Sequence, residues 1–193
     1  MNSLSHIAAE AAMLEPIHRP EPTMAIRFPL LLLVLLSLAG CAGTPATGER
    51  QYLLPAASQP AAGSTLMVRV RVAGYLDQGG LVVETGATTL SSARAHRWAE
   101  PLADQLERAL VQALPAPANG TLTVRVTRFQ GTADGDARVS GDWHFQGTDG
   151  APVGGVFDKR EALERDGYEE LVLRLDAAWM AVAGDIGARL GAR

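Results

Sequence analysis

The residues with the clearest chemical meaning are Leu38-Ala39-Gly40-Cys41, which close an apolar run that starts at Leu30 and contain the only cysteine of the chain. A secretory signal combines a positive charge, a short apolar stretch and small residues at the cleavage site. Arg27 supplies the charge, and Ala39 and Gly40 supply the small residues. The pattern predicts cleavage before Cys41, acyl chains on that cysteine, and a domain tethered to a membrane outside the cytoplasm.

The apolar run is too short to cross a bilayer as a helix, because a spanning helix needs about 20 residues. A short buried helix that ends in an ordinary core cysteine is the alternative interpretation. Ala42, not Asp, follows Cys41. This choice favours the outer membrane over the inner one, with the domain facing the periplasm. Several acyl chains would make the attachment effectively permanent, since each buried CH₂ adds about 0.8 kcal/mol.

The segments around the cysteine divide the chain into four parts. Residues 1–23 place Glu10, Glu15 and Glu21 ahead of the apolar run, which does not fit a signal, so we expect Met24 to be the true start and 1–23 to be a non-native extension. Residues 24–40 are then the lipoprotein signal peptide. Residues 41–50 form a lipidated flexible tether, and 51–193 form the domain.

Other candidates for chemistry are few, and we expect no enzyme activity, cofactor or metal. His96 and His144 are the histidines of residues 41–193, and neither lies in a Gly-x-Ser-x-Gly or His-x-x-x-His pattern. His144 alternates with Trp143 and Phe145, so it should face away from the aromatic side of its strand. Asp134-Gly135-Asp136 lacks the further carboxylates of a calcium loop. A net charge of −4 without a basic stripe argues against nucleic acid as a partner.

Hydrophobic periodicity predicts a single α+β domain. Apolar stripes at helical spacing indicate two long amphipathic helices, and alternation indicates half-buried strands. A mixed sheet with an antiparallel meander over its last three strands should pack against the helices. The expected helices cover 98–114 and 168–190, and the expected strands cover 51–55, 66–72, 81–84, 121–129, 139–145 and 153–157.

Two short segments are candidates for contact with a partner or a second subunit. Trp98 and Glu100 stand at the expected start of the first helix; alternatively, Trp98 anchors that start in the core and Glu100 interacts with the helix N–H groups. Tyr75 and Leu76 could form an exposed hydrophobic loop tip, and the alternative is a packed turn.

These segments carry a resemblance to a known group of proteins. The chain resembles the PqiC/YmbA-type lipoproteins, which are auxiliary lipoproteins of ABC-type transport systems, over essentially all of 41–193. It differs where the family has a proline before Tyr-Leu-Asp, since Gly74 precedes Tyr75 here. The matching residues are Tyr52-Leu53-Leu54, Tyr75-Leu76-Asp77, Leu81-Val82-Val83, His96-Arg97-Trp98-Ala99-Glu100-Pro101-Leu102, Asp166-Gly167-Tyr168 and Gly184-Asp185-Ile186.

The resemblance implies a role without catalysis. It implies a lipoprotein that docks an MCE-domain periplasmic protein and its transport system to the outer membrane, forms a ring-like homo-oligomer, and supports lipid transport and membrane integrity. A lipoprotein that itself binds a lipid or small hydrophobic ligand, in a pocket between helices and sheet, is the second hypothesis. An envelope hydrolase is the third.

Overall fold

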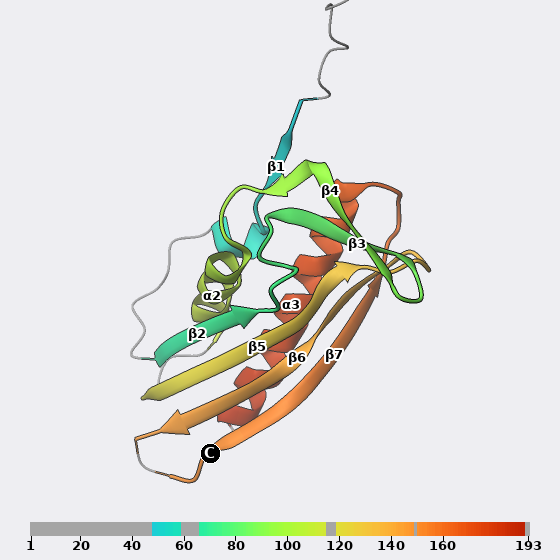
Figure 1. Ribbon diagram of the computed structural model, residues 1–193. Coiled ribbons are helices and arrows are strands. Elements are labelled where there is room, and N and C mark those ends of the chain that lie inside the picture. Colours follow the sequence, from blue (N-terminus) through green and yellow to red (C-terminus); the bar gives the residue numbers. More distant parts are fainter. Residues whose placement is uncertain (1–47, 59–65, 115–118, 149, 192–193) are drawn as a thin grey trace, which may run out of the picture. The chain divides into compact units, whose positions relative to one another are not determined.

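The computed structural model describes residues 48–58, 66–114, 119–148 and 150–191 (Figure 1). Cys41, residues 1–23 and the signal segment 24–40 lie outside the described residues, as do residues 41–47 of the tether. The elements are β1 (Arg50–Tyr52), η2 (Pro55–Ser58), β2 (Leu66–Val72), β3 (Gly80–Gly86), β4 (Thr89–Trp98), α2 (Leu102–Ala113), β5 (Gly120–Gly131), β6 (Asp136–Gly147), β7 (Val153–Ala162) and α3 (Tyr168–Gly191).

The strands form one mixed sheet with seven members, and β5 lies at its centre. The order is β1-β4-β3-β5-β6-β7, and β2 pairs with β5 in addition. β2 runs parallel to β5 from Leu66↔Gly120 to Val72↔Val126, whereas β3 meets the far end of β5 at Val83↔Gly131. The meander of β5, β6 and β7 is antiparallel throughout. This confirms the expected α+β fold with a mixed sheet and a meander.

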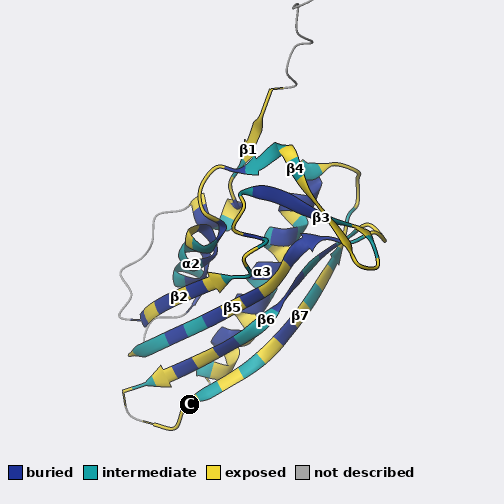
Figure 2. Ribbon diagram, in the orientation of Figure 1, coloured by how far each residue is buried: buried dark blue, intermediate teal, exposed yellow. Residues whose placement is uncertain are grey.

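Both helices cover the same face of the sheet, and within the described residues no helix covers the opposite face. α2 lies over β2, and α3 lies over β6 and β7 (Figure 1). Along the central strands buried residues alternate with more exposed ones (Figure 2), as the period of two in a strand requires. We call the helix-covered side the inner face and the other side the outer face.

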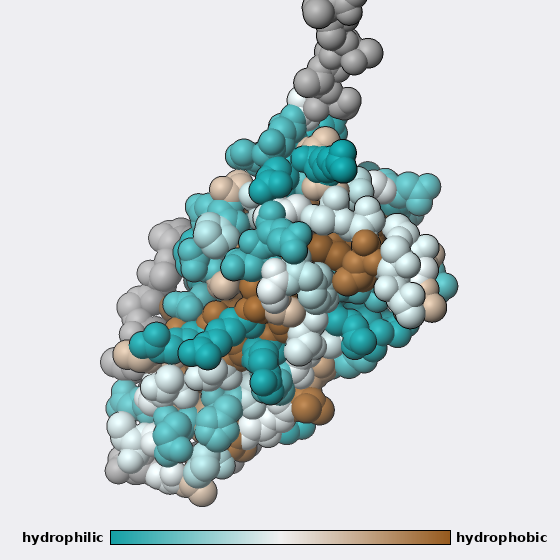
Figure 3. Space-filling model, viewed as in Figure 1, coloured by the Kyte–Doolittle hydropathy of each residue, from teal (hydrophilic) through white to brown (hydrophobic). Residues whose placement is uncertain are grey.

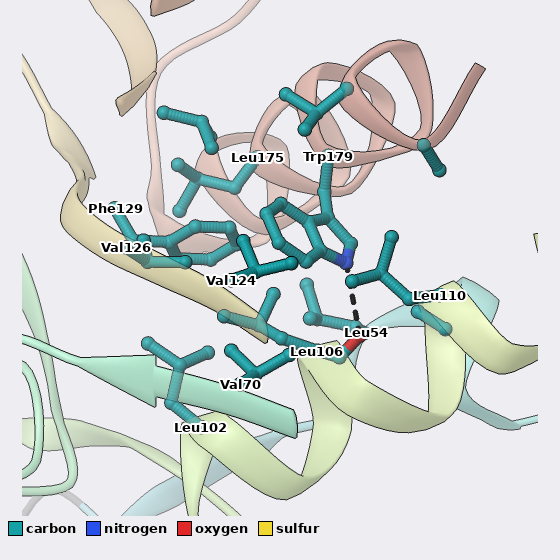
Figure 4. Close-up of a cluster of buried hydrophobic side chains, with 14 of the residues drawn as sticks. Leu54, Val70, Leu102, Leu106, Leu110, Val124, Val126, Phe129, Leu175 and Trp179 are labelled. Atoms are coloured by element: carbon teal, nitrogen blue, oxygen red, sulfur yellow. Dashed lines mark hydrogen bonds between the residues drawn. The ribbon is translucent and has the colours of Figure 1, made fainter. Parts of the chain in front are cut away.

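Trp179 joins the two layers of the core. Its side chain is fully buried, and its indole Nε1 donates a hydrogen bond to the Leu106 carbonyl of α2 at 3.2 Å (Figure 4). The rings of Phe129 from β5 and Phe157 from β7 meet it edge-on, with centroids 6.5 and 6.1 Å away. Trp179 of α3 therefore contacts α2 and the two outer strands of the meander, β5 and β7.

The expected elements are confirmed where an apolar stripe or alternation indicates a buried side, but the sequence did not predict β4. The first helix begins at Leu102 and not at Trp98, because Trp98 is the last residue of β4. No strand is expected over Thr89–Arg97, because its Thr, Ser, Ala and Arg residues give no apolar alternation. In the structure most of these residues are exposed. β4 is stabilised by antiparallel pairing to β3 and parallel pairing to β1. The first strand is also shorter than expected and ends at Tyr52.

Candidate docking surface

The residues that follow Tyr75 and Leu76 in the turn lie beside Trp98 and Glu100, whereas Tyr75 and Leu76 themselves do not line that surface. The Trp98 N–H donates to the Gly79 carbonyl at 2.7 Å, and the Arg97 guanidinium donates to the Gln78 carbonyl at 3.2 Å. Between them lies a hollow of about 290 Å³, lined by residues 77–79 and 97–101. We call it the N-terminal hollow, because β1 adjoins it.

Gly79 allows the two segments to approach this closely. Its φ of +79° lies in the left-handed region, which side chains other than glycine disfavour. A Cβ at this position would lie 2.7 Å from Nη2 of Arg97. The turn therefore favours glycine for its backbone conformation, and a larger residue would also displace the end of the Arg97 side chain.

Leu76 and Trp98 are core residues. Leu76 is 2% exposed and Trp98 is 7% exposed, and the Trp98 ring packs against Phe129 with centroids 5.9 Å apart. The expectation of an exposed loop tip is therefore wrong for Leu76, and the packed turn describes it. Its backbone N–H donates to the Ala73 carbonyl at 2.8 Å, which closes the turn.

Glu100 is exposed and Tyr75 is half-buried, and each makes contacts that the sequence did not indicate. The Glu100 carboxylate is exposed and forms an ion pair with Arg108 of α2. No side chain caps the N-terminus of α2, where Pro101 is the N-cap residue. Tyr75 is half-buried; its hydroxyl lies 2.6 Å from Oε1 of Gln130 and 2.9 Å from the Thr127 carbonyl. Burial raises the pKa of Tyr75.

β1 connects the N-terminal hollow to the preceding part of the chain. Gln51 pairs with Arg97, and the Ala99 N–H donates to the Tyr52 carbonyl at 2.9 Å. Glu49 lies 3.5 Å from Nε of Arg97. The first described residues are thus bonded to the same segment that lines the hollow.

Gln105 fixes this arrangement from inside. The side chain is fully buried on α2, and its Oε1 accepts a hydrogen bond from the Leu54 N–H at 2.9 Å. Its Nε2 donates to the Glu100 carbonyl at 3.0 Å. A single amide therefore holds both the loop after β1 and the connection from β4 to α2.

His96 lies between two tyrosines, which the sequence did not indicate. Its ring stacks on Tyr168 with centroids 4.0 Å apart and on Tyr52 at 5.7 Å. Nδ1 of His96 is 2.8 Å from the Tyr52 hydroxyl. These contacts join β1, β4 and the start of α3. His144, in contrast, is exposed between buried Trp143 and Phe145, as predicted.

A buried carboxylate at the start of α3 is the other polar feature that sequence reasoning missed. Asp166 and Glu169 have capping-box spacing, yet Glu170 is the buried residue, 3% exposed. Its oxygens accept hydrogen bonds from Arg174 at 2.7 Å, from Arg165 at 3.1 Å and from the Glu164 N–H at 3.3 Å. The bond from Arg174, followed by the one from Arg165, holds the pKa of Glu170 below its usual range. The cluster fixes the loop between β7 and α3.

Comparison with known proteins defines the class first. Residues 52–187 match the family described as ABC-type transport auxiliary lipoprotein component, and the chain belongs to this family. It is 30% identical over 177 residues to the proteins named intermembrane transport lipoprotein PqiC from Escherichia coli (strain K12) and Shigella flexneri. The aligned part covers 81% of this chain and 94% of each relative. The resemblance seen in the sequence is thereby confirmed.

Solved structures agree with this assignment. An uncharacterised protein is 28% identical, with a TM-score of 0.64 over 74% of this chain and 98% of its own. A protein from Xanthomonas campestris is 18% identical, with a TM-score of 0.54 over 72% of this chain and 88% of its own, and it shares the fold. Within the described residues, no helix has the length and apolar character needed to span a membrane.

Proposed function

We propose that this transport auxiliary lipoprotein is a non-catalytic docking subunit of an MCE/ABC-type intermembrane lipid transport system. Acylated Cys41 anchors it to the periplasmic face of the outer membrane, and residues 41–50 tether the domain 51–193. Residues 24–40 are the signal peptide and 1–23 a non-native extension. The observation that carries the proposal is the family match over 52–187, together with the name of the PqiC relatives.

The N-terminal hollow is the surface that we assign to docking. It supports this role because it is built from backbone fixed by Gly79 and Gln105, so a partner would meet a rigid surface. Its lining includes the exposed charged residues Asp77 and Glu100 and the half-buried Arg97, and Trp98 supports the hollow from the core. Charged groups around a fixed hollow favour specificity and orientation in a protein interface.

Capture of the partner tests the proposal. Full-length, acylated protein with a C-terminal tag should recover an MCE-domain protein from solubilised envelopes, and Asp77→Arg should reduce that recovery. Asp134→Arg is the matched control, because Asp134 is exposed in the turn between β5 and β6, outside the hollow. Failure to recover an MCE protein, with normal detergent sensitivity of a deletion strain, would contradict the transport role. Equal recovery by both variants would contradict the docking surface.

The homo-oligomer is tested separately by native mass spectrometry of the acylated protein in detergent. A bare oligomer supports docking, and a lipid retained on a monomer supports the alternative of a lipid-binding lipoprotein. Trp179, Leu106, Leu110 and Leu122 are fully buried and fill the space between the helices and the centre of the sheet. The start of α3 and the ends of β3 and β5 border a hollow of about 190 Å³, with Val83, Leu163 and Leu171 in its lining, and the alternative would place its ligand there.

A further inference from the structure

The outer face of the sheet carries a second hollow, of about 540 Å³, where the β3–β4 hairpin lies beside β5 and β6. We call it the outer-face hollow. Hydrophilic and intermediate side chains predominate over this face in Figure 3, with a hydrophobic area near β3. The lining combines Tyr75, Glu84, Arg128, Gln130 and Arg138 with hydroxyl groups of the hairpin, among them Thr88 and Thr89. A volume of this size is within the range of small-molecule sites.

A β-bulge in β5 presents Arg128 to this hollow. The register with β6 shifts between Val126 and Arg128, so that Thr127 and Arg128 are both exposed although they are neighbours in the chain. Bulges often redirect a side chain at a functional site. Among the residues that the structure describes, no ion pair involves Arg128. Arg138, in contrast, is held by both carboxylate oxygens of Asp158, at 2.7 and 3.0 Å.

Glu84 is the counterpart of Arg128 on the β3 side. Its Oε1 accepts a hydrogen bond from Nε2 of Gln130 at 2.6 Å, and Oε1 of Gln130 in turn accepts from the Tyr75 hydroxyl at 2.6 Å. Gln130 is 2% exposed, so this chain of bonds is fixed from within the fold. It holds the Glu84 carboxylate at the hollow, where no ion pair with another described residue neutralises it.

Among the described residues that line the hollow, Arg128 and Glu84 are therefore the charged groups without an ion pair, because Arg138 pairs with Asp158. The charge of Glu84 also acts on Arg138, but less than that of Asp158. A simple anion would bind Arg128 but would also meet Glu84, and a simple cation would meet Arg128. A ligand with both charges satisfies both groups. The guanidinium of Arg128 and the nearby threonine hydroxyls can donate hydrogen bonds from several directions. Donors arranged in this way suit the several oxygens of a phosphate better than a planar carboxylate.

We propose that the outer-face hollow binds a zwitterionic phosphate ester of the phosphoethanolamine type, with its phosphate on Arg128 and its ammonium on Glu84. The ligand can be the headgroup of a phospholipid or a free glycerophospho ester, since both present the same chemistry. This inference rests on described residues of the domain and does not depend on the proposed docking role.

Calorimetric titration of the full-length acylated protein in a non-ionic detergent tests the proposal. The probes are glycerophosphoethanolamine, glycerol 3-phosphate and alanine, a zwitterion without phosphate. Arg128→Gln should weaken binding of both phosphate probes at least tenfold, because it removes the charge-assisted hydrogen bonds from the guanidinium to the phosphate. Glu84→Gln should weaken only glycerophosphoethanolamine. Arg69→Gln is the matched control, since Arg69 is an exposed arginine on neighbouring β2 that does not line the hollow.

Each of the following outcomes would overturn a stated part of the proposed binding site. Binding of all probes weaker than about 1 mM overturns the site. An equal loss in Arg69→Gln indicates general charge attraction and also overturns it. Alanine binding as tightly as glycerophosphoethanolamine overturns the phosphate assignment, and indifference to Glu84→Gln overturns the ammonium assignment. Hydrogen exchange in nanodiscs distinguishes the two sources. Arg128-dependent protection of the β3–β4 hairpin only when ethanolamine lipid is present identifies a headgroup, and protection only by the soluble ester identifies a free ligand.

Discussion

Replacing Gln105 with leucine should destabilise the domain by about 2 kcal/mol, because it removes two hydrogen bonds while keeping a side chain of similar size. The Leu54 N–H is buried and loses the Gln105 acceptor, which costs about 1–3 kcal/mol for an unsatisfied group. The Glu100 carbonyl is only partly buried, so water can replace the amide of Gln105 there. Added apolar contact of the leucine offsets part of the loss.

Urea unfolding followed by tryptophan fluorescence measures this effect, and thermal unfolding should show a fall in Tm of about 4–8 °C for a domain of this size. Gln146→Leu is the matched control, because Gln146 is exposed on the outer face of β6 and should change stability by less than about 0.5 kcal/mol. Hydrogen exchange of the Leu54 amide should also rise in Gln105→Leu. A stability equal to that of the control variant would refute the reasoning that Gln105 fixes the N-terminal hollow.

Three further substitutions have defined outcomes. Gly79→Ala should cost about 1–2 kcal/mol in urea unfolding, since alanine disfavours φ of +79°, whereas Gly74→Ala, which meets no atom within 4 Å, should be near neutral. Asp158→Asn should cost less than about 1 kcal/mol, because the ion pair with Arg138 is partly exposed. Arg138 lowers the pKa of Asp158 to about 2, so this contribution is present above the ordinary pKa of 3.8 and is lost as pH falls toward 2; a difference that grows on acidification would contradict it. Cys41→Ser should leave the domain folded by circular dichroism but release it from the membrane fraction and abolish its function.

The sequence predicts those elements whose side chains are buried on one side. The alternation of Leu122, Val124 and Val126 and the stripe along α3 follow from the need to bury apolar surface, and both appear as expected. β4 has no such pattern. Pairing with β3 and β1 stabilises this strand, rather than burial of one of its sides. β3 directly precedes β4 in a tight hairpin, whereas the pairing with β1 depends on residues that are distant in sequence. Because Pro101 fits the first turn of a helix, the sequence predicts a helix start at Trp98, which in the structure is the end of β4.

The site could be predicted only as segments. Asp77 and Trp98–Glu100 line the same hollow, but a large apolar residue at a turn can point inward or outward with the same local sequence. Leu76 and Trp98 point inward. The sequence does not predict the outer-face hollow, because Glu84 and Arg128 are 44 positions apart in the chain. In addition, no residue pattern marks the bulge that turns Arg128 toward the hollow. The three residues of the His96 stack are also separated in sequence and meet only through β1, β4 and α3.

One turn borders both hollows, and this decides how they can be tested. Residues 73–79 supply Tyr75 to the outer-face hollow and Asp77 to the N-terminal hollow, while Leu76 between them is buried. Leu76→Ala would leave a cavity at this point, and large-to-small core changes of this kind cost about 2–5 kcal/mol. Both surfaces would then change together, and a loss of partner binding would reflect a loss of folded structure and not the loss of a docking contact. Charge changes at exposed Asp77 and Arg128 leave the core residue in place, so they separate docking from ligand binding.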